Sequence, residues 1–197
     1  MDLKDIQKKL KKELDKNRYE HTIGVMYTAA NLAMAYEYDI QKAMTAGLLH
    51  DCAKCLSNEK QIALCEQNDV EISNIERNNP FLLHQKTGAI LAEKDYEIRD
   101  PEILHAISVH TTGCANMNLL DKIIFVADYI EPGRDKASHL QELRREAFHD
   151  INACIADILY DTLHYLNHKN SAIDPTTQLV YESYRQYEKE RPWKHLN

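Results

Sequence analysis

Residues 48–54 read LLHDCAK and place an imidazole beside a carboxylate at the end of an apolar segment. One helix face, at the i, i+3, i+4 and i+7 spacing, is formed by Met44, Gly47, Leu48 and Asp51. Burying a carboxylate without a partner costs several kcal/mol, so Asp51 needs a cation or a metal ion nearby. Because successive helical residues point about 100° apart, His50 and Asp51 can both reach one ion in a cleft beyond the helix.

The hydrophobic residues on both sides of this segment recur with helical period almost throughout, and five glycines and five prolines leave little room for hairpins. We therefore predict an all-α fold with a single domain over residues 1–197. Helices are predicted over residues 3–14, 19–38, 40–54, 80–94, 101–113, 118–130, 138–148, 150–167 and 175–188, with a further helix starting at Ser57. The predicted start signals include Asp39, Asp100 ahead of Pro101, and Asn118, and Gly113 is predicted to end a helix.

The composition is that of a globular chain, with 44% hydrophobic and 28% charged residues. A net charge of −7 argues against broad nucleic-acid binding, which depends on neutralising phosphates, but it allows a small anionic ligand beside a metal ion. No apolar run approaches the roughly 20 residues of a membrane span, and the charged N-terminus lacks the apolar segment of a signal peptide. We therefore expect a cytoplasmic protein that binds neither nucleic acid nor membranes.

The five cysteines are an odd number in a chain without a secretion signal, which argues against a disulfide framework. Cys52 and Cys55 form a C-x-x-C pair, but there is no second pair at zinc-finger spacing and no βαβ pattern around this one. We interpret the cysteines as ordinary packing thiols and leave the redox activity of Cys52 and Cys55 open.

Side chains of metal-ligand type recur on the apolar faces of five predicted helices. They are His21, His50, Asp51, His84, His110 and Asp128. A single histidine on such a face, for example His84, is usually a hydrogen-bonded core residue. Together, with few inward lysines or arginines to neutralise them, these side chains favour one or two metal ions. Imidazole and carboxylate suit iron, manganese, zinc and related divalent ions, and do not single one out.

The remaining histidines are assigned no such role. His164 and His168, with Asp157 and Asp161 behind them, form a row away from the apolar face of the helix predicted over residues 150–167. We therefore expect this row to face solvent. The histidines left without a role are His105, His139, His149 and His195.

A family resemblance rests on the order His21, His50-Asp51, Asp128 and on the stretches HDCAK (50–54), HTTG (110–113) and ADYIEPGR (127–134). The chain resembles the HD-domain superfamily of metal-dependent phosphohydrolases, and within it the YqeK-type symmetrical bis(5′-nucleosyl)-tetraphosphatases. The resemblance extends over about residues 15–185. It implies an all-α HD-domain helical bundle with its metal-binding core at about 15–135, while helices within 136–197 complete the bundle and the nucleotide pocket.

The resemblance implies that the metal is bound by His21, His50, Asp51 and Asp128, of which Asp51 and Asp128 are catalytic. Iron is the expected metal, with manganese, cobalt, zinc or magnesium as alternatives. The implied reaction is hydrolysis of diadenosine tetraphosphate to two ADP. A metal suits it, because a metal screens the charge of a polyphosphate, polarises the phosphoryl oxygen and lowers the pKa of a bound water. His84 and His110 would contact phosphate or hold a second metal ion that Asp51 bridges.

The predicted substrate contacts, besides His84 and His110, are Lys54, Thr111, Arg134, Thr177 and Tyr181. Lysine and arginine near a metal suit phosphate, and the chain has no glycine-rich phosphate loop. Thr177 and Tyr181 lie in AIDPTTQLVYESY (172–184), which is similar to the family segment that closes over the nucleotide. The chain departs from the family at Glu182, where asparagine is frequent, and at Cys52, where a larger aliphatic residue is common. The departure at Glu182 bears on the contacts to the nucleotide base, and the departure at Cys52 bears on packing.

Two other functions stay open from the sequence. One is a different HD phosphohydrolase activity, on a deoxynucleoside triphosphate, a cyclic nucleotide or a guanosine polyphosphate. The other is a non-catalytic nucleotide sensor that uses the same pocket. The sequence does not identify the native metal, the number of ions, the base specificity or the acid that protonates the leaving group. A homodimer is compatible with a chain of this size.

Overall fold

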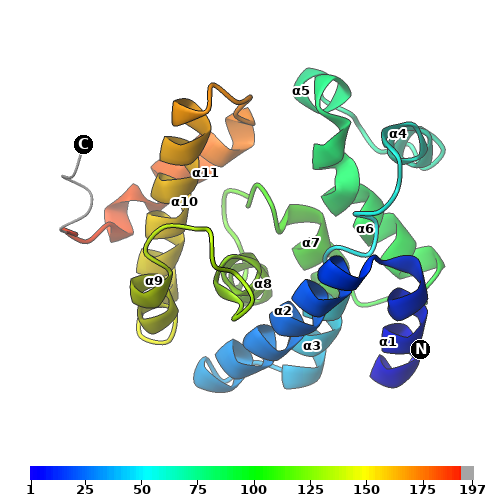
Figure 1. Ribbon diagram of the computed structural model, residues 1–197, viewed down its shortest axis with the longest axis horizontal. Coiled ribbons are helices and arrows are strands. Elements are labelled where there is room, and N and C mark those ends of the chain that lie inside the picture. The colour runs from blue at the N-terminus through cyan, green and yellow to red at the C-terminus, as the bar shows by residue number, and fades with distance from the viewer. Residues whose placement is uncertain (192–197) are drawn as a thin grey trace.

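The computed structural model describes residues 1–191, and every regular element in this range is a helix. The α-helices are α1 (Leu3–Glu13), α2 (Lys16–Ala35), α3 (Ile40–Leu49), α4 (Asn58–Glu66), α5 (Asn74–Asn78), α6 (His84–Lys94), α7 (Pro101–Val109), α8 (Leu119–Ile130), α9 (Leu140–Glu146), α10 (Ile151–His168) and α11 (Pro175–Tyr184). Two 3₁₀-helices are η1 (Pro80–Leu83) and η2 (Arg185–Tyr187). The predicted all-α class is confirmed (Figure 1). Residues 192–197, with His195, lie outside the described part of the chain.

Polar caps set the start of most helices. Four of the predicted start signals accept hydrogen bonds from N–H groups of the first turn, namely Asp39, Ser57, Asp100 and Asn118. Asp15 caps α2 in the same way, so this helix begins at Lys16 and not at the predicted residue 19. Within residues 1–191, no helix combines the length and the apolar character that crossing a bilayer requires.

Two helices that carry predicted ligands end earlier than the sequence pattern indicates. α3 ends at Leu49 and not near residue 54, and α7 ends at Val109 and not at Gly113. In α3, the His50 Nδ1–H donates to the carbonyl oxygen of Gly47 at 2.7 Å, and the backbone hydrogen bonds over residues 49–54 then span three residues. The His50 side chain therefore forms a hydrogen bond with a carbonyl oxygen of the last turn, and α3 ends at this point. The predicted end of α3 was wrong, because the apolar periodicity of the sequence carries no information about this side-chain hydrogen bond.

The other boundary differences concern short segments. The predicted helix 80–94 consists of η1 followed by α6, with His84 at the junction. The helices predicted over 138–148 and 175–188 are shortened to α9 and to α11 followed by η2. The pattern does not predict α5, a five-residue helix with a Ser73–Glu76 capping box. In α5 the capping box marks the start of the helix, because five residues offer few repeating apolar positions.

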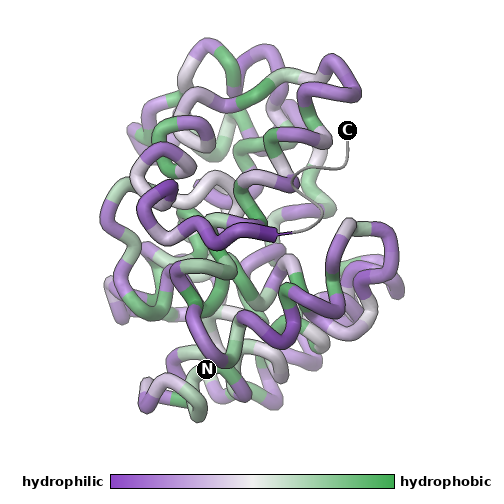
Figure 2. Tube along the Cα trace, turned by 90° about the vertical axis from the view of Figure 1, so that its left-hand side faces the viewer, coloured by the Kyte–Doolittle hydropathy of each residue, from purple (hydrophilic) through white to green (hydrophobic). Residues whose placement is uncertain are grey.

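α2, α3 and α8 form the centre of the molecule, and α2 packs along both of the others. α9, α10 and α11 lie on one side of α8, and α4, α5 and α6 lie on the other side of the centre (Figure 1). Gly47 permits the close approach of α3 to α2, because an added Cβ would lie 3.1 Å from the Met26 Cα. Hydrophobic positions recur along the helices (Figure 2), and those of α8 are almost entirely buried. Helices from distant parts of the sequence thus share one core.

The expected solvent-facing row on α10 is half wrong. His164 and His168 are exposed, but the side chains of Asp157 and Asp161 are buried. Arg191 Nε donates to Asp157 Oδ2 at 2.9 Å, and His139 Nδ1 donates to Asp161 Oδ2 at 3.0 Å. Residues distant in sequence cover this part of α10, which the pattern of one helix cannot reveal.

The five cysteines are free thiols. Cys52, Cys65 and Cys154 are buried, as expected of packing thiols, and the Cys52 Sγ–H donates to the Gly88 carbonyl. Cys55 is exposed, so the prediction of a packing thiol is wrong for this residue. Cys114 is half-buried.

Candidate metal centre

Four imidazoles from separate elements stand in a row at the centre of the molecule. His21 lies on α2, His50 follows α3, His110 follows α7, and His84 begins α6. Successive ring centroids, in the order His21, His50, His110 and His84, are 5.2, 5.0 and 5.0 Å apart. Three of the rings are buried, and the His21 side chain is 12% exposed. The fold thus assembles nitrogen donors that are up to 89 residues apart in the sequence.

Local hydrogen bonds orient these rings. The Nδ1–H groups of His50, His84 and His110 each donate at 2.7 Å to a backbone carbonyl three residues earlier, which belongs to Gly47, Phe81 and Ile107 respectively. His21 Nδ1 donates to Glu131 Oε1 at 3.1 Å. In a neutral histidine that donates from Nδ1, the Nε2 atom carries a lone pair. The rings of His50, His84 and His110 therefore present an Nε2 lone pair to one interior space, which the Nε2 atom of His21 also faces.

Asp51 lies between the two halves of the row. Its Oδ2 atom is 3.5 Å from His50 Nε2 and 3.9 Å from His21 Nε2. Its Oδ1 atom is 3.4 Å from His84 Nε2 and 3.5 Å from His110 Nε2. One carboxylate thus faces two pairs of imidazoles, one pair for each oxygen.

Asp128, from α8, joins the first pair. Its Oδ1 atom is 3.1 Å from His21 Nε2 and 3.9 Å from His50 Nε2. The four residues implied as metal ligands therefore stand within a few ångströms of one another, and His84 and His110 adjoin them through Asp51.

The donor set fits a divalent metal ion. Asp51 Oδ1 is buried and has no hydrogen-bond partner within the described structure, although two imidazole nitrogens face it. Burial, the neighbouring His110 and Lys54 lower the pKa of His84 to about 3, so this ring is neutral near pH 7. Lone pairs on nitrogen and oxygen that converge in a buried space repel one another unless a cation lies between them. Imidazole and carboxylate donors are typical ligands of divalent transition metals. The described residues therefore can bind metal in this cluster.

The carboxyl groups of Asp51 and Asp128 are ionised. Burial opposes ionisation of Asp51, but the imidazoles of His50, His110 and His84 outweigh it and hold the pKa of Asp51 well below its ordinary value. Burial likewise opposes ionisation of Asp128, and the hydrogen bond with His21 helps to lower its pKa. The pKa of His21 is raised, because Asp128, Glu131 and Asp51 together outweigh the effect of burial.

The depressed pKa of His84 predicts that acid destabilises the fold. Below pH 6.5 the unfolded chain protonates this histidine, whereas the buried ring stays neutral down to about pH 3. The unfolded state binds more protons in this window, so the free energy of unfolding falls as pH falls from 6.5 to 3. Urea unfolding of chelator-treated protein at several pH values measures the slope, which we expect to be shallower in His84→Gln. Asp51 and Asp128 act in the same direction, whereas His21, whose pKa is raised, acts in the opposite direction in both proteins. Equal slopes in both proteins would contradict the assignment to His84.

Two residues of the cluster were missed by the sequence reasoning. Arg18 Nη1 lies 2.5 Å from Asp51 Oδ2, and the buried Glu131 orients His21. Arg18 is thus an inward cation that the sequence reasoning did not name, in addition to the predicted Lys54. Arg18 lies three residues before His21, nearly one helical turn away, and that spacing could have indicated it. Glu131 lies just beyond the end of α8, where helical periodicity no longer predicts the direction of a side chain.

Glu131 is expected to tune metal affinity through His21. Gly24 leaves room for this carboxylate, because an added Cβ would lie 2.5 Å from Glu131 Oε2. Glu131→Gln removes the charge behind the ring, and we expect metal affinity to fall by about 10- to 100-fold. Competition with a coloured chelator measures the affinity, and Glu20→Gln, an exposed carboxylate on α2, is the matched control. An unchanged affinity in Glu131→Gln would remove the orienting role.

The predicted substrate contacts divide into two groups. Lys54 Nζ lies 2.9 Å from His84 Nε2, Thr111 Oγ1 lies 3.0 Å from the same atom, and Arg134 Nη2 donates to Asp128 Oδ1 at 2.9 Å. These three residues border the cluster. Thr177 and Tyr181, on α11, are not brought into contact with it: Thr177 is buried in α11, and the Tyr181 hydroxyl donates to Glu188.

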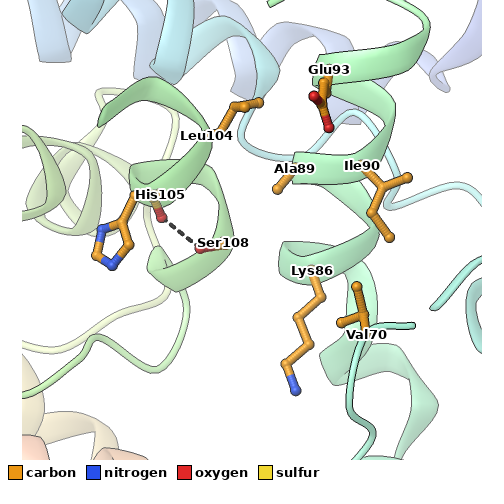
Figure 3. Close-up of a pocket in the computed structure, with 8 residues that line it drawn as sticks. All are labelled: Val70, Lys86, Ala89, Ile90, Glu93, Leu104, His105 and Ser108. Atoms are coloured by element: carbon orange, nitrogen blue, oxygen red, sulfur yellow. Dashed lines mark hydrogen bonds between the residues drawn. The ribbon is translucent and has the colours of Figure 1, made fainter. Parts of the chain in front are cut away.

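A cavity of about 470 Å³ gives access to the His21 end of the row. Its lining includes His21 and the cationic side chains of Arg18, Arg134 and Lys136. A different groove of about 310 Å³, between α6 and α7, is largely apolar and contains no member of the cluster (Figure 3). Of these two cavities, the polar one opens onto the candidate metal ligands, and its lining also includes the carboxylates of Asp15, Glu131 and Asp135.

Comparison with known proteins supports the same assignment. Residues 18–133 match the HD domain family. The chain is 42% identical over 172 residues to a protein of Halalkalibacterium halodurans named "Bis(5'-nucleosyl)-tetraphosphatase, symmetrical", covering 87% of this chain and 91% of that protein. It is 38% identical over 174 residues to a Bacillus subtilis protein of the same name, with the same coverage.

A solved structure agrees in fold over nearly the whole chain. It is described as the crystal structure of a predicted HD superfamily hydrolase involved in NAD metabolism from Clostridium acetobutylicum. The TM-score is 0.91 at 39% identity, and the match covers 95% of this chain and 99% of the other. Family, relatives and fold agree with the row of imidazoles and its bridging aspartate: the chain belongs to the HD domain family of hydrolases, in the group represented by the symmetrical bis(5′-nucleosyl)-tetraphosphatases.

Proposed function

We propose that this chain is a metal-dependent hydrolase that cleaves diadenosine tetraphosphate symmetrically to two ADP. The single observation that carries the proposal is Asp51, whose two oxygens each face a separate pair of imidazoles. Relatives of 38 to 42% identity over most of the chain are named for this activity. Arg18, Arg134 and Lys136 in the lining of the cavity beside His21 can bind the phosphates of a polyphosphate.

The candidate ligands would provide two metal positions. His21, His50, Asp51 and Asp128 would hold one ion, and His84 and His110, together with Asp51, would hold a second. A metal bound there supplies Lewis acidity toward a phosphoryl oxygen and lowers the pKa of a bound water. We take iron as the native metal, with manganese, cobalt, zinc or magnesium as alternatives, since the donor types do not separate them.

The chain's own cations bind and orient the substrate. Arg18 and Arg134 lie beside the two metal-facing carboxylates, Asp51 and Asp128, and line the same cavity. Lys54 reaches the opposite end of the row at His84. Positive charge therefore stands at both ends of the donor row, where it would help to neutralise the phosphates of the substrate. Planar guanidinium groups bind phosphate oxygens in pairs and hold the anhydride in place.

The nucleoside contacts are proposed from the sequence resemblance. Thr177 and Tyr181 belong to the C-terminal segment that is similar to the family's nucleotide-closing segment. A cavity of about 600 Å³ lies between the start of α11 and the loop after α7, with Thr176 and Gly113 among its lining residues. This cavity supports the role of α11 in holding a nucleoside. The extent of the domain over residues 1–197, its cytoplasmic location, a homodimer and the absence of nucleic-acid binding stay predictions.

Lys54→Ala and Arg134→Ala separate substrate binding from metal binding. Each is expected to raise KM for diadenosine tetraphosphate by about 10-fold, the loss of one charge-assisted phosphate contact of about 1.4 kcal/mol. Metal content should stay within error of the parent, because neither residue is a ligand. Steady-state kinetics and metal analysis of the same preparations test both expectations. Kinetics equal to the parent in both variants would remove the phosphate-binding role.

Product chromatography after incubation with diadenosine tetraphosphate tests the function itself. The protein is purified anaerobically, its metal content is measured, and the expected products are two ADP per substrate. Release of triphosphate from a deoxynucleoside triphosphate, or opening of a cyclic nucleotide, would assign a different phosphohydrolase activity. Tight ADP binding without turnover in metal-replete, reducing conditions would indicate a sensor.

A further inference from the structure

A second cluster of metal-ligand type lies outside the imidazole row. His105 is on α7, Cys114 is in the loop that follows it, and Asp121 is in the first turn of α8. Neither the sequence reasoning nor the proposed function uses these three side chains. Each offers one donor atom, and the three donor atoms lie within 4.8 Å of one another.

The carboxylate of this cluster is held in place before any ligand arrives. Asp121 is fully buried, and its Oδ2 accepts a hydrogen bond from the Asn118 N–H at 2.9 Å within the capping box of α8. Its Oδ1 lies 2.9 Å from His105 Nδ1. One oxygen is therefore fixed by backbone, and the other points toward the imidazole and the thiol.

The other two donors can be reached from solvent. The His105 side chain is 47% exposed, and its ring points away from the groove between α6 and α7 (Figure 3). Cys114 is half-buried and lines the cavity of about 600 Å³ between the end of α7 and the start of α11. A small ion can therefore enter without unfolding a helix.

We propose that His105, Cys114 and Asp121 form a binding site for a divalent zinc-type cation. Cysteine sulfur, imidazole nitrogen and carboxylate oxygen are the three donor types that zinc takes in proteins. Around a tetrahedral zinc such donors lie roughly 3.3 to 3.6 Å apart, given bond lengths of about 2.0 to 2.3 Å. The loop residue Cys114 supplies the small adjustment that this needs, and water takes the fourth position.

Binding has a defined chemical balance. Cys114 loses its thiol proton to solvent and coordinates as a thiolate, and neutral His105 moves its ring proton to Nε2 so that Nδ1 can coordinate. Thiolate and carboxylate together neutralise the two charges of the cation. No oxidation or reduction takes place.

The site would tie together the segment that positions the catalytic cluster. The loop between α7 and α8 begins at His110, and α8 carries Asp128. A cation bound to both helices and to the loop between them would hold this segment. The site contains no residue of the imidazole row, so it can be tested independently of the proposed function.

Cobalt(II) titration of the full chain tests the site. Cobalt bound to a cysteine thiolate has intense near-ultraviolet charge-transfer absorption, which imidazole and carboxylate ligands do not give. We expect this band in the parent, its loss on addition of zinc, and its absence in Cys114→Ser. Cys55→Ser, which removes an exposed free thiol, is the matched control and should keep the band. His105→Gln should weaken cobalt binding at this band by at least about 10-fold.

Three outcomes would overturn the proposal: no charge-transfer band in the parent, a band that persists in Cys114→Ser, or equal affinity in His105→Gln. Circular dichroism checks that the variants fold, and both substitutions are conservative at half-buried or exposed positions. Metal analysis gives a second readout, because zinc-loaded parent should hold one more zinc per chain than Cys114→Ser. Equal zinc content in the two proteins would also overturn it.

Discussion

Asp51→Asn is expected to remove the bound metal and to lower kcat/KM for diadenosine tetraphosphate by about 1000-fold or more, which corresponds to about 4 kcal/mol of transition-state stabilisation. Asp51 is the only carboxylate of the cluster whose two oxygens face different pairs of imidazoles within the described residues. Asparagine keeps the shape of the side chain but loses its charge, and its amide nitrogen is not a metal ligand. Both proposed metal positions therefore lose a shared donor in one substitution.

Metal analysis, circular dichroism and kinetics on the same preparation check this result. Asp135→Asn is the matched control, since Asp135 is an exposed carboxylate that lines the same cavity but is not a member of the cluster of metal-ligand type. The control should keep parental metal content and kinetics. If Asp51→Asn keeps parental metal content and turnover, the bridging assignment is wrong. If metal is lost but turnover persists, the metal-dependent mechanism is wrong.

Gly47→Leu is expected to lower the free energy of unfolding by about 3 kcal/mol and Tm by roughly 10 °C. A Cβ at this position would lie 3.1 Å from the Met26 Cα and 3.3 Å from the Ala29 Cβ, so a larger side chain must push α3 away from α2. The Met26 backbone cannot move aside in the way that the end of a flexible side chain can. Because α2 carries His21 and α3 leads into His50, separating the helices should also weaken metal binding by at least about 10-fold.

A second substitution separates the two effects. Leu159→Ala, on α10, removes a buried core side chain and should cost about 3 kcal/mol of stability by leaving a cavity. Leu159 is not part of the α2–α3 contact, so metal affinity should remain near the parental value. Thermal unfolding of both variants measures the loss of stability, and competition with a chelator measures the loss of metal affinity. Equal loss of metal affinity in both would mean that global stability, and not helix spacing, controls the site.

The sequence by itself determined the helical class, many helix starts and the identity of the candidate ligands. Polar caps such as Asp39, Asp100 and Asn118 act within one turn, so their effect is visible in a short stretch of sequence. A carboxylate such as Asp51 on an apolar helix face is anomalous locally, because burying it alone is costly. These features depend on neighbours three or four residues away.

Only the tertiary structure decided which side chains meet. The pairing of Asp51 with His84 and His110, the orientation of His21 by Glu131, and the approach of Arg18 all join different helices. The burial of Asp157 by residues far along the chain has the same origin. Periodicity records the direction of a side chain on its own helix, whereas contacts across helices depend on crossing geometry and on close approaches such as that at Gly47. That information lies in the packed core and in no single segment.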